Sequence, residues 1–192
     1  MLFPCVFISY ASDSQNHTAY QKKIDRLTRG AKLTDLIEAP NDQWIAFVKT
    51  SRKAIPQTCA FSVDDTNYAD EIWIVNIEKM QKKLLVAANL DCNHPEKTII
   101  DPNNLQFSPD SKTLYFATSA WATSGAIHAI NTNGKNLRFV TPGNEYRVVM
   151  DGKYTSDLIV TQRRYREQGG SYDWDWLFTP AGKQIKLYRK EG

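Results

Sequence analysis

Residues 107–117 read Phe-Ser-Pro-Asp-Ser-Lys-Thr-Leu-Tyr-Phe-Ala, and residues 38–48 read Glu-Ala-Pro-Asn-Asp-Gln-Trp-Ile-Ala-Phe-Val. In both stretches a proline opens a polar turn that leads directly into an apolar run. Proline fixes φ for the turn, and β-branched and aromatic residues favour the strand that follows. A turn and strand that recur in one chain indicate a repeat architecture.

Further copies of the same unit follow along the chain. Apolar runs at 71–76, 126–131 and 175–179 are similar, with His128 standing in register with Trp73 and Trp176. The last two runs lead into glycine turns at 133–135 and 181–183, and Asn133-Gly134 predicts a type I′ hairpin. A period of about 40–55 residues built from short strands predicts a propeller-type array.

Each copy divides into four short runs bounded by Gly, Pro, Asn and Asp, which are strand signals. The predicted strands are 33–37, 44–48, 72–77 and 83–87, then 104–107, 113–117, 126–131 and 137–141, then 146–150, 156–162, 172–178 and 185–189. A run at 24–28 resembles the last strand of a preceding copy. The predicted fold class is all-β, a β-propeller-type array of about three to four four-stranded antiparallel blades.

The predicted organisation has two parts. Residues 21–192 carry the blades, at approximately 31–88, 98–141 and 145–190. Residues 1–20 are an amino-terminal strand, over Val6–Tyr10, or the remnant of a signal segment, because the apolar run near Phe7 is followed by small residues but has no basic residue before it.

Composition excludes several classes of partner. Hydrophobic residues make up 42% and charged residues 23% of the 192-residue chain, with a net charge of only +3. That charge is too small and too evenly spread to predict binding to nucleic acid or to an anionic membrane. No apolar run reaches the length of a transmembrane helix, so the chain is predicted not to be membrane-embedded.

Cysteine and histidine usage predicts no metal site or cofactor. Cys5, Cys59 and Cys92 form no CxxC pair, so free thiols are favoured over a Cys59–Cys92 disulfide. His94 follows Asp91 in a short loop, but one loop offers few ligands. The acidic residues at 64–70, in a long insertion at 49–70, lack the calcium-loop spacing and are interpreted as a solvated loop.

Residues 107–116 resemble the WD40-like repeat of the TolB family, whose blades carry an F-S-P-D-G-K-x-L-x-F segment, and residues 125–141 resemble the rest of that blade. Ser111 stands where the family usually has glycine. The resemblance implies four-stranded blades around a central channel, in a family that includes periplasmic TolB and the propellers of prolyl-oligopeptidase-like and dipeptidyl-peptidase-like enzymes. We therefore expect a periplasmic or extracellular, non-enzymatic module that binds a protein or peptide.

The alternative is a glycan-active propeller enzyme, or the non-catalytic propeller portion of such a peptidase. No Gly-x-Ser-x-Gly nucleophile elbow occurs, and no catalytic residue is predicted. Glycoside chemistry would need two carboxylates about 5–10 Å apart. The candidates near predicted inner strands are Asp35, Glu38, Asp101, Glu145 and Asp157.

The best candidate for partner binding lies between residues 163 and 176. Tyr172, Trp174 and Trp176 alternate with polar residues and so share one strand face, where they form either inter-blade packing or a stacking platform. A basic cluster precedes them, which either belongs to a solvated hairpin or binds an acidic partner. The candidate site residues are Arg163, Arg164, Arg166, Tyr172, Trp174 and Trp176.

Assembly is left open by the sequence. An open arc of three to four blades would leave free strand edges, which pair readily with other strands. The arc closes on itself, pairs with a second copy as a homodimer, or belongs to a longer propeller.

Overall fold

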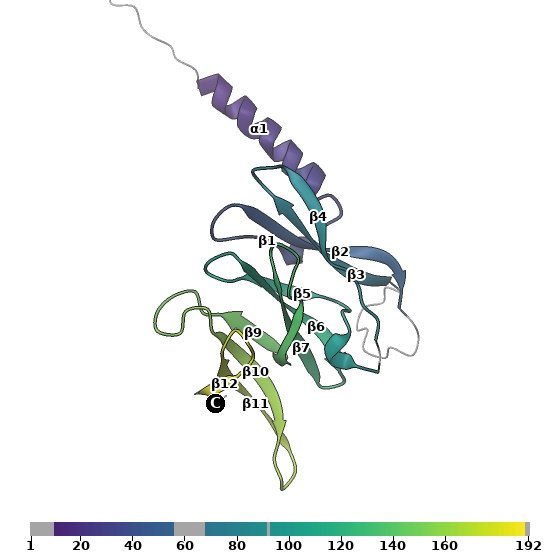
Figure 1. Cartoon of the computed structure of the whole chain (residues 1–192), viewed down its shortest axis with the longest axis vertical. Coiled ribbons are helices and arrows are strands. Elements are labelled where there is room, and N and C mark those ends of the chain that lie inside the picture. Colours follow the sequence, from purple (N-terminus) through teal and green to yellow (C-terminus); the bar gives the residue numbers. More distant parts are fainter. Residues whose placement is uncertain (1–9, 56–67, 92, 191–192) are drawn as a thin grey trace, which may run out of the picture.

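The computed structural model describes residues 10–55, 68–91 and 93–190, which form one helix and three four-stranded antiparallel sheets (Figure 1). Each sheet keeps its strands in chain order and is here called a blade. Residues 87–102 connect blade 1 to blade 2, and residues 143–144 connect blade 2 to blade 3. The 3₁₀ turns at Leu33–Asp35 and Pro95–Lys97 precede blades 1 and 2. This arrangement confirms the predicted fold class.

The strand bounds define the three blades. Blade 1 contains β1 (Leu36–Glu38), β2 (Trp44–Ala54), β3 (Tyr68–Asn76) and β4 (Gln81–Val86); blade 2 contains β5 (Asn103–Phe107), β6 (Thr113–Trp121), β7 (Ser124–Asn131) and β8 (Arg138–Pro142); blade 3 contains β9 (Glu145–Val148), β10 (Leu158–Tyr165), β11 (Ser171–Phe178) and β12 (Gln184–Arg189).

Each blade has two faces because side chains alternate along a strand. We call the face turned toward the preceding blade the preceding face and the other the following face. Strand pairing places Phe47 opposite Trp73, Phe116 opposite His128, and Val160 opposite Trp176. These three pairs occupy the same position on the preceding faces of blades 1, 2 and 3. The predicted register of Trp73, His128 and Trp176 is therefore confirmed.

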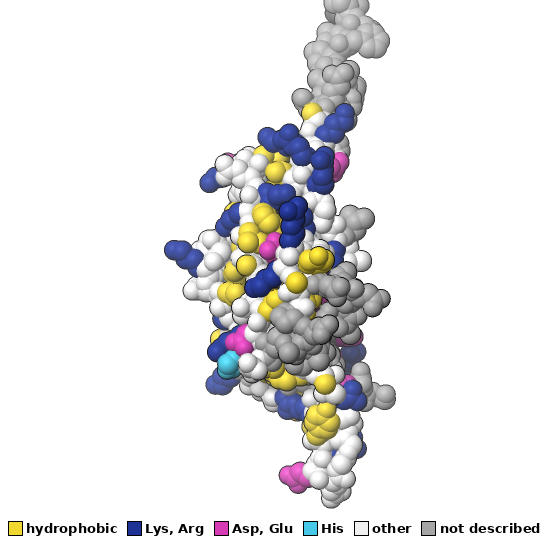
Figure 2. All heavy atoms as spheres, turned by 90° about the vertical axis from the view of Figure 1, so that its right-hand side faces the viewer, with side chains coloured by type: hydrophobic (Ala, Val, Ile, Leu, Met, Phe, Trp, Pro, Cys, Tyr) yellow, Lys and Arg dark blue, Asp and Glu magenta, His cyan; other side chains and the backbone are white. Residues whose placement is uncertain are grey.

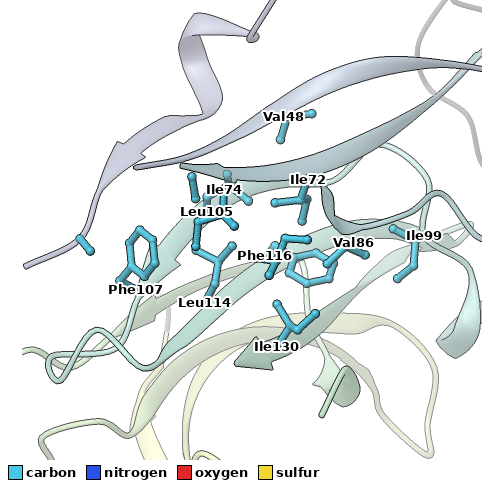
Figure 3. Close-up of a cluster of buried hydrophobic side chains, with 13 residues drawn as sticks. Val48, Ile72, Ile74, Val86, Ile99, Leu105, Phe107, Leu114, Phe116 and Ile130 are labelled. Carbon is cyan, nitrogen blue, oxygen red and sulfur yellow. The ribbon is translucent and has the colours of Figure 1, made fainter. Parts of the chain in front are cut away.

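Two apolar cores join the blades. The first lies between the following face of blade 1 and the preceding face of blade 2, where residues such as Ile72 and Ile74 meet Leu114 and Phe116 (Figure 3). The second joins blades 2 and 3 in the same way, through Tyr115, Ile127, Val148, Leu158, Val160 and Phe178, among others. Burial of these side chains is the main force that stacks one blade on the next.

The turns that begin the second strand of blades 1 and 2 explain a departure from the family pattern. Ser111 and Asp42 both have positive φ, +58° and +56°. Glycine adopts this left-handed conformation most readily, which is the physical reason for the glycine usual at this place. Ser111 compensates with a contact that glycine lacks, since its Oγ accepts a hydrogen bond from the backbone N of Asn41 at 3.1 Å.

The predicted type I′ turn at Asn133-Gly134 is wrong. Of the two residues Asn133 and Gly134, only Gly134 has positive φ. Asn131 pairs with Lys135 across a three-residue loop. This is a turn followed by one left-handed glycine, the common three-residue hairpin. Gly182 closes the equivalent loop of blade 3, and there a Cβ would lie 2.1 Å from the carbonyl oxygen of Val140 in blade 2. Glycine at this second turn therefore permits close packing between blades as well.

The amino-terminal prediction needs correction. Residues 24–28 were predicted to be a strand, but Tyr10–Leu27 form helix α1, which ends before Gly30 at φ +81°. Tyr10 is helical, and the rest of the predicted 6–10 strand lies outside the described residues. The helix extends away from the blades and meets blade 1 only near its carboxy-terminal end (Figure 1). Among the described residues, no helix, α1 included, is long and apolar enough to cross a membrane.

Other predictions fall outside the described residues. These are the disulfide or free thiols of Cys5, Cys59 and Cys92, the acidic residues Asp64 and Asp65, and the segment 1–9. Asp70, at the end of the same acidic run, contradicts the prediction of a solvated loop, because it lies in β3, is 2% exposed and has its Oδ2 2.5 Å from the Lys32 Nζ. Lys and Arg side chains are conspicuous where α1 meets blade 1 (Figure 2).

Candidate functional site

The candidate site is built on a two-stranded ribbon at the end of blade 3. β10 pairs with β9 only as far as Thr161, and β11 pairs with β12 only from Asp175 onward. Residues 162–165 and 171–174 therefore pair with each other and project beyond the four-stranded part of the blade (Figure 1). Gly169 and Gly170, both at positive φ, close the ribbon at its tip.

Aromatic rings follow one another along the preceding face of this ribbon. The ring centroids of Tyr172 and Trp174 lie 4.2 Å apart, and those of Trp174 and Trp176 lie 6.3 Å apart. Trp176 also packs against the core between blades 2 and 3. Trp176 thus belongs to inter-blade packing, whereas Tyr172 and Trp174 continue the row of rings onto the ribbon.

A cation stacks on each of the three rings. The Arg164 guanidinium carbon lies 3.7 Å from the Trp176 ring centroid, the Lys190 Nζ lies 4.9 Å from Trp174, and the Arg166 guanidinium carbon lies 5.6 Å from Tyr172. Positive charge over an aromatic face is attracted by the ring quadrupole. We call these six residues the cation–aromatic ladder: Arg164, Arg166, Tyr172, Trp174, Trp176 and Lys190.

Hydrogen bonds hold the innermost guanidinium in place. Arg164 donates from Nε and Nη2 to the Gln162 Oε1, at 3.1 and 2.6 Å. Gln162 is buried and donates in turn to the Thr141 Oγ1 and the Pro142 carbonyl of blade 2. Partial burial lowers the pKa of Arg164 from its usual value. The base of the ladder is therefore fixed to the inter-blade core.

The structure separates one of the predicted site residues from the other five. Arg163 lies on the opposite face of the ribbon, where its Nε and Nη2 donate to the Ser171 Oγ at 3.2 and 3.0 Å. The pairing of Arg164 with Tyr172 sets this arrangement, because neighbouring residues on a strand point to opposite faces. Lys190, which the sequence analysis missed, takes a place in the ladder because β12 brings it beside Trp174.

A cleft of about 620 Å³ lies beside the ribbon, at the junction of blades 2 and 3. The β6–β7 hairpin forms one wall, and Asp101, Asn103, Asn144 and Arg163 contribute polar groups to its lining. The Thr123 Oγ1 and the Tyr165 hydroxyl, 3.0 Å apart, join the hairpin of blade 2 to the ribbon of blade 3. No motif in the sequence marks this cleft, because its residues come from four separate segments.

The residues considered for catalysis or metal binding have different surroundings. Asp101 lines the cleft, Glu145 lines a smaller cavity on blade 3, and the Asp35 Oδ1 accepts a hydrogen bond from the Asn104 backbone N at 3.1 Å. Burial raises the pKa of Asp157. Within the described residues, no three His, Cys, Asp or Glu side chains gather as metal ligands would.

His94 and His128 have different surroundings. His94 Nδ1 lies 2.9 Å from a carboxylate oxygen of Asp91 in an exposed loop. His128 is 2% exposed, stacks on Phe116 at a centroid distance of 5.2 Å, and has its Nε2 3.1 Å from the Thr118 Oγ1. Burial lowers the pKa of His128 to about 4. The prediction that His128 belongs to a strand face is confirmed.

Comparison with known proteins identifies the fold. No protein-family model and no curated protein sequence matches the chain. Among solved structures, the β-propeller domain of the trilobed protease from Pyrococcus furiosus matches with 17% identity and a TM-score of 0.51, over 85% of this chain and 44% of that one. TolB from Acinetobacter baumannii matches with 14% identity and a TM-score of 0.51, over 85% and 33% of the two chains.

The acylaminoacyl peptidase of Pyrococcus horikoshii is also similar, with 18% identity and a TM-score of 0.52, over 85% of this chain and 26% of that enzyme. This chain therefore spans less than half the length of each of these three proteins. At these identities the likeness establishes the fold, which is that of the TolB and peptidase propellers, as the sequence motifs predicted.

Proposed function

We propose that this chain is a binding module that acts without catalysis and holds a protein or peptide partner at the ribbon of blade 3. The observation that carries the proposal is the cation–aromatic ladder, in which three cations and three rings share one face of a projecting two-stranded ribbon. Rings and guanidinium groups are enriched where proteins bind each other, because they combine large contact area with directed polar contacts.

The ribbon also offers backbone hydrogen-bonding groups. Within the described residues, neither the β10 edge over 162–165 nor the β11 edge over 171–174 pairs with a third strand. An extended peptide can add to such an edge, with main-chain hydrogen bonds giving affinity and side-chain contacts giving specificity. The cations of the ladder would then lie beside alternate side chains of the peptide.

The charge of the ladder favours an acidic partner. Arg164, Arg166 and Lys190 all lie on the ladder face. Carboxylates in alternate positions of an extended segment would meet these cations, and arginine binds carboxylates in a planar, two-pronged geometry. The proposed partner is thus an extended acidic segment of a protein, and a periplasmic or extracellular location is part of the same proposal.

The test is a titration of the full chain with a fluorescein-labelled peptide of four Val-Glu repeats, followed by fluorescence anisotropy. We expect saturable binding that weakens with added salt, because the contacts are charged. The variant Arg164→Gln with Arg166→Gln should lose about tenfold or more in affinity, equivalent to about 1.4 kcal/mol. A peptide of four Val-Lys repeats should not bind.

The single variant Arg166→Gln removes one positive charge from the ladder face, and its matched control is Arg163→Gln, which removes one from the opposite face of the ribbon. The control should retain nearly full affinity. Equal losses in these two single variants would contradict a face-specific site, and would indicate attraction by overall charge alone.

A further inference from the structure

The cleft at the junction of blades 2 and 3 has no part in the proposed function, and its size suits a small molecule. Its volume of about 620 Å³ lies within the range of about 300–1,000 Å³ that is typical of small-molecule sites. Its polar lining comes from the start of β5, the β6–β7 hairpin, the connection to β9 and the ribbon, and includes Asp101, Asn103, Ser119, Thr123, Asn144 and Arg163. These side chains determine which ligand the cleft can hold.

Two asparagines of the lining offer opposite ends of their amide groups to a ligand. The Asn103 Nδ2 donates to the Asp101 carbonyl at 2.9 Å, so the Asn103 Oδ1 remains as an acceptor. The Asn144 Oδ1 accepts from the Gly125 backbone N at 3.1 Å, so the Asn144 Nδ2 remains as a donor. Because these internal hydrogen bonds orient both amides, the cleft offers an acceptor and a donor at fixed places.

The two charged residues of the lining are already engaged in part. The Asp101 carboxylate accepts from the Ser119 Oγ at 3.4 Å. Arg163 donates from Nε and Nη2 to the Ser171 Oγ, which occupies the side-on fork that arginine uses to bind carboxylates and leaves Nη1 as a donor. Among the described residues of the lining, this carboxylate and this guanidinium are the only charges, and they cancel. The lining therefore favours a neutral ligand over an ion.

The smaller cavity of about 120 Å³ on blade 3 provides a contrast. Thr161, Asp175 and Arg189 line it on the following face of that blade. The Asp175 carboxylate accepts from the Thr161 Oγ1 at 2.7 Å and from the Arg189 Nη2 at 2.8 Å. This polar group is satisfied within the chain, and a ligand would have to break its hydrogen bonds before making new ones. The cleft, in contrast, keeps hydrogen-bonding capacity for a ligand.

We propose that the cleft binds a neutral sugar of one or two rings. A sugar hydroxyl both donates and accepts, so neighbouring hydroxyls donate to the Asn103 Oδ1 and accept from the Asn144 Nδ2. A neutral sugar also matches the cancelled charge of the lining. Asp101 is the only carboxylate among the described residues of the lining, whereas glycoside hydrolysis uses a pair, so the sugar is held and not cleaved.

The first experiment titrates the isotope-labelled full chain with four neutral disaccharides and follows the amide signals by NMR. The probes are maltose, cellobiose, lactose and N,N′-diacetylchitobiose. We expect at least one of them to bind saturably, with a Kd of about 10 mM or below. The largest shifts should fall on residues 119–125 and 144. Zwitterionic glycylglycine should not bind. The proposal is overturned if no disaccharide saturates, or if glycylglycine alone does.

The second experiment locates the site with a matched pair of variants. Asn144→Asp keeps the Oδ1 that accepts from Gly125 but replaces the Nδ2 donor with a charged oxygen, and should weaken sugar binding about tenfold. The control is Asn133→Asp, the same change at an exposed residue whose Oδ1 accepts from the Lys135 backbone N at 2.9 Å. It should bind like the wild type. Equal affinities of the two variants would place the sugar elsewhere and overturn the proposal.

A further pair of variants covers the case in which Asn144→Asp unfolds the chain. Arg163→Leu removes the Nη1 donor at an exposed position and should also weaken sugar binding, so an unchanged affinity would overturn the proposal. The ladder variant Arg164→Gln with Arg166→Gln should bind the sugar like the wild type, because its substitutions lie outside the lining. A loss of sugar binding in the ladder variant equal to that in Arg163→Leu would overturn the assignment to the cleft.

Discussion

The same face of two neighbouring blades is buried in two ways. On blade 2, Phe116 and His128 lie beneath a complete blade and are 0% and 2% exposed. On blade 1, Phe47 is equally buried beneath the end of α1, but Trp73 beside it is only partly buried. A few helical residues can thus seal the centre of a sheet face, but they leave its edge at Trp73 more exposed than blade 1 leaves the equivalent His128 of blade 2.

The comparison predicts its largest difference at the two phenylalanines. Replacing Phe116 with Ala should cost about 4–5 kcal/mol of unfolding free energy. Phe116 lies between two four-stranded sheets, and neither sheet can move as a whole to fill the cavity. Phe47→Ala should cost about 3 kcal/mol, since the end of α1 can shift toward the sheet. Urea denaturation of both variants measures these values. A larger loss for Phe47→Ala would show that the helix is held as firmly as a blade.

A second prediction uses the histidine as a measure of burial. The pKa of His128 is lowered to about 4 in the folded protein by burial, against about 6.5 when unfolded. As pH falls below 6.5 the unfolded chain binds a proton that the folded protein does not, so stability is lost between pH 6.5 and 4. At about 1.4 kcal/mol per pH unit, the loss should reach about 2 kcal/mol at pH 5.

His128→Phe should remove this part of the pH dependence and keep the stacking on Phe116. Urea denaturation at pH 7 and pH 5 of wild type and variant provides the measurement, because the titration of all other groups is common to both proteins. Parallel losses in the two proteins would mean that water reaches His128, and that a blade covers this position no better than the helix covers Trp73.

The smallest effect is expected at the half-covered edge of blade 1. Lys82 Nζ lies 5.5 Å from the Trp73 ring centroid, and partial burial, followed by the charge of Lys49, lowers the pKa of Lys82. Lys82→Gln removes a cation–π contact worth about 0.5–1 kcal/mol but also relieves repulsion from Lys49. The net change in a thermal or urea unfolding experiment should stay within about 0.5 kcal/mol. A loss above about 1 kcal/mol would show that this edge is packed as tightly as the blade 2 face.

Local pattern was sufficient to predict most of the fold. The strand alternation around Trp73, His128 and Trp176 placed these residues at one register position, because a repeated face needs apolar or aromatic residues at the same point in each copy. The helix was missed although Tyr20, Ile24 and Leu27 follow the spacing of one helical face. Residues 24–28 also resemble the last strand of a blade, and this similarity masks the helical spacing in the sequence.

The part of the candidate site that could be predicted also depends on local pattern. Alternation alone gathered Tyr172, Trp174 and Trp176 on one face, and their ring contacts confirm that grouping. Arg163 was grouped with its neighbours because charge clustering ignores which face each residue takes. Lys190 and the cleft between blades 2 and 3 depend on long-range strand pairing, which no short segment of the sequence encodes.

The polar group on the following face of blade 3 has a consequence for protein engineering. Designers often lengthen repeat proteins by duplicating an internal unit, and each added unit must bury the surface of the previous one. A fourth blade placed after blade 3 would meet Asp175 and Arg189 where the internal junctions present aliphatic side chains. Duplicating blade 2 between blades 2 and 3 avoids that mismatch, so the array can be extended from within but not at this end without rewriting those two residues.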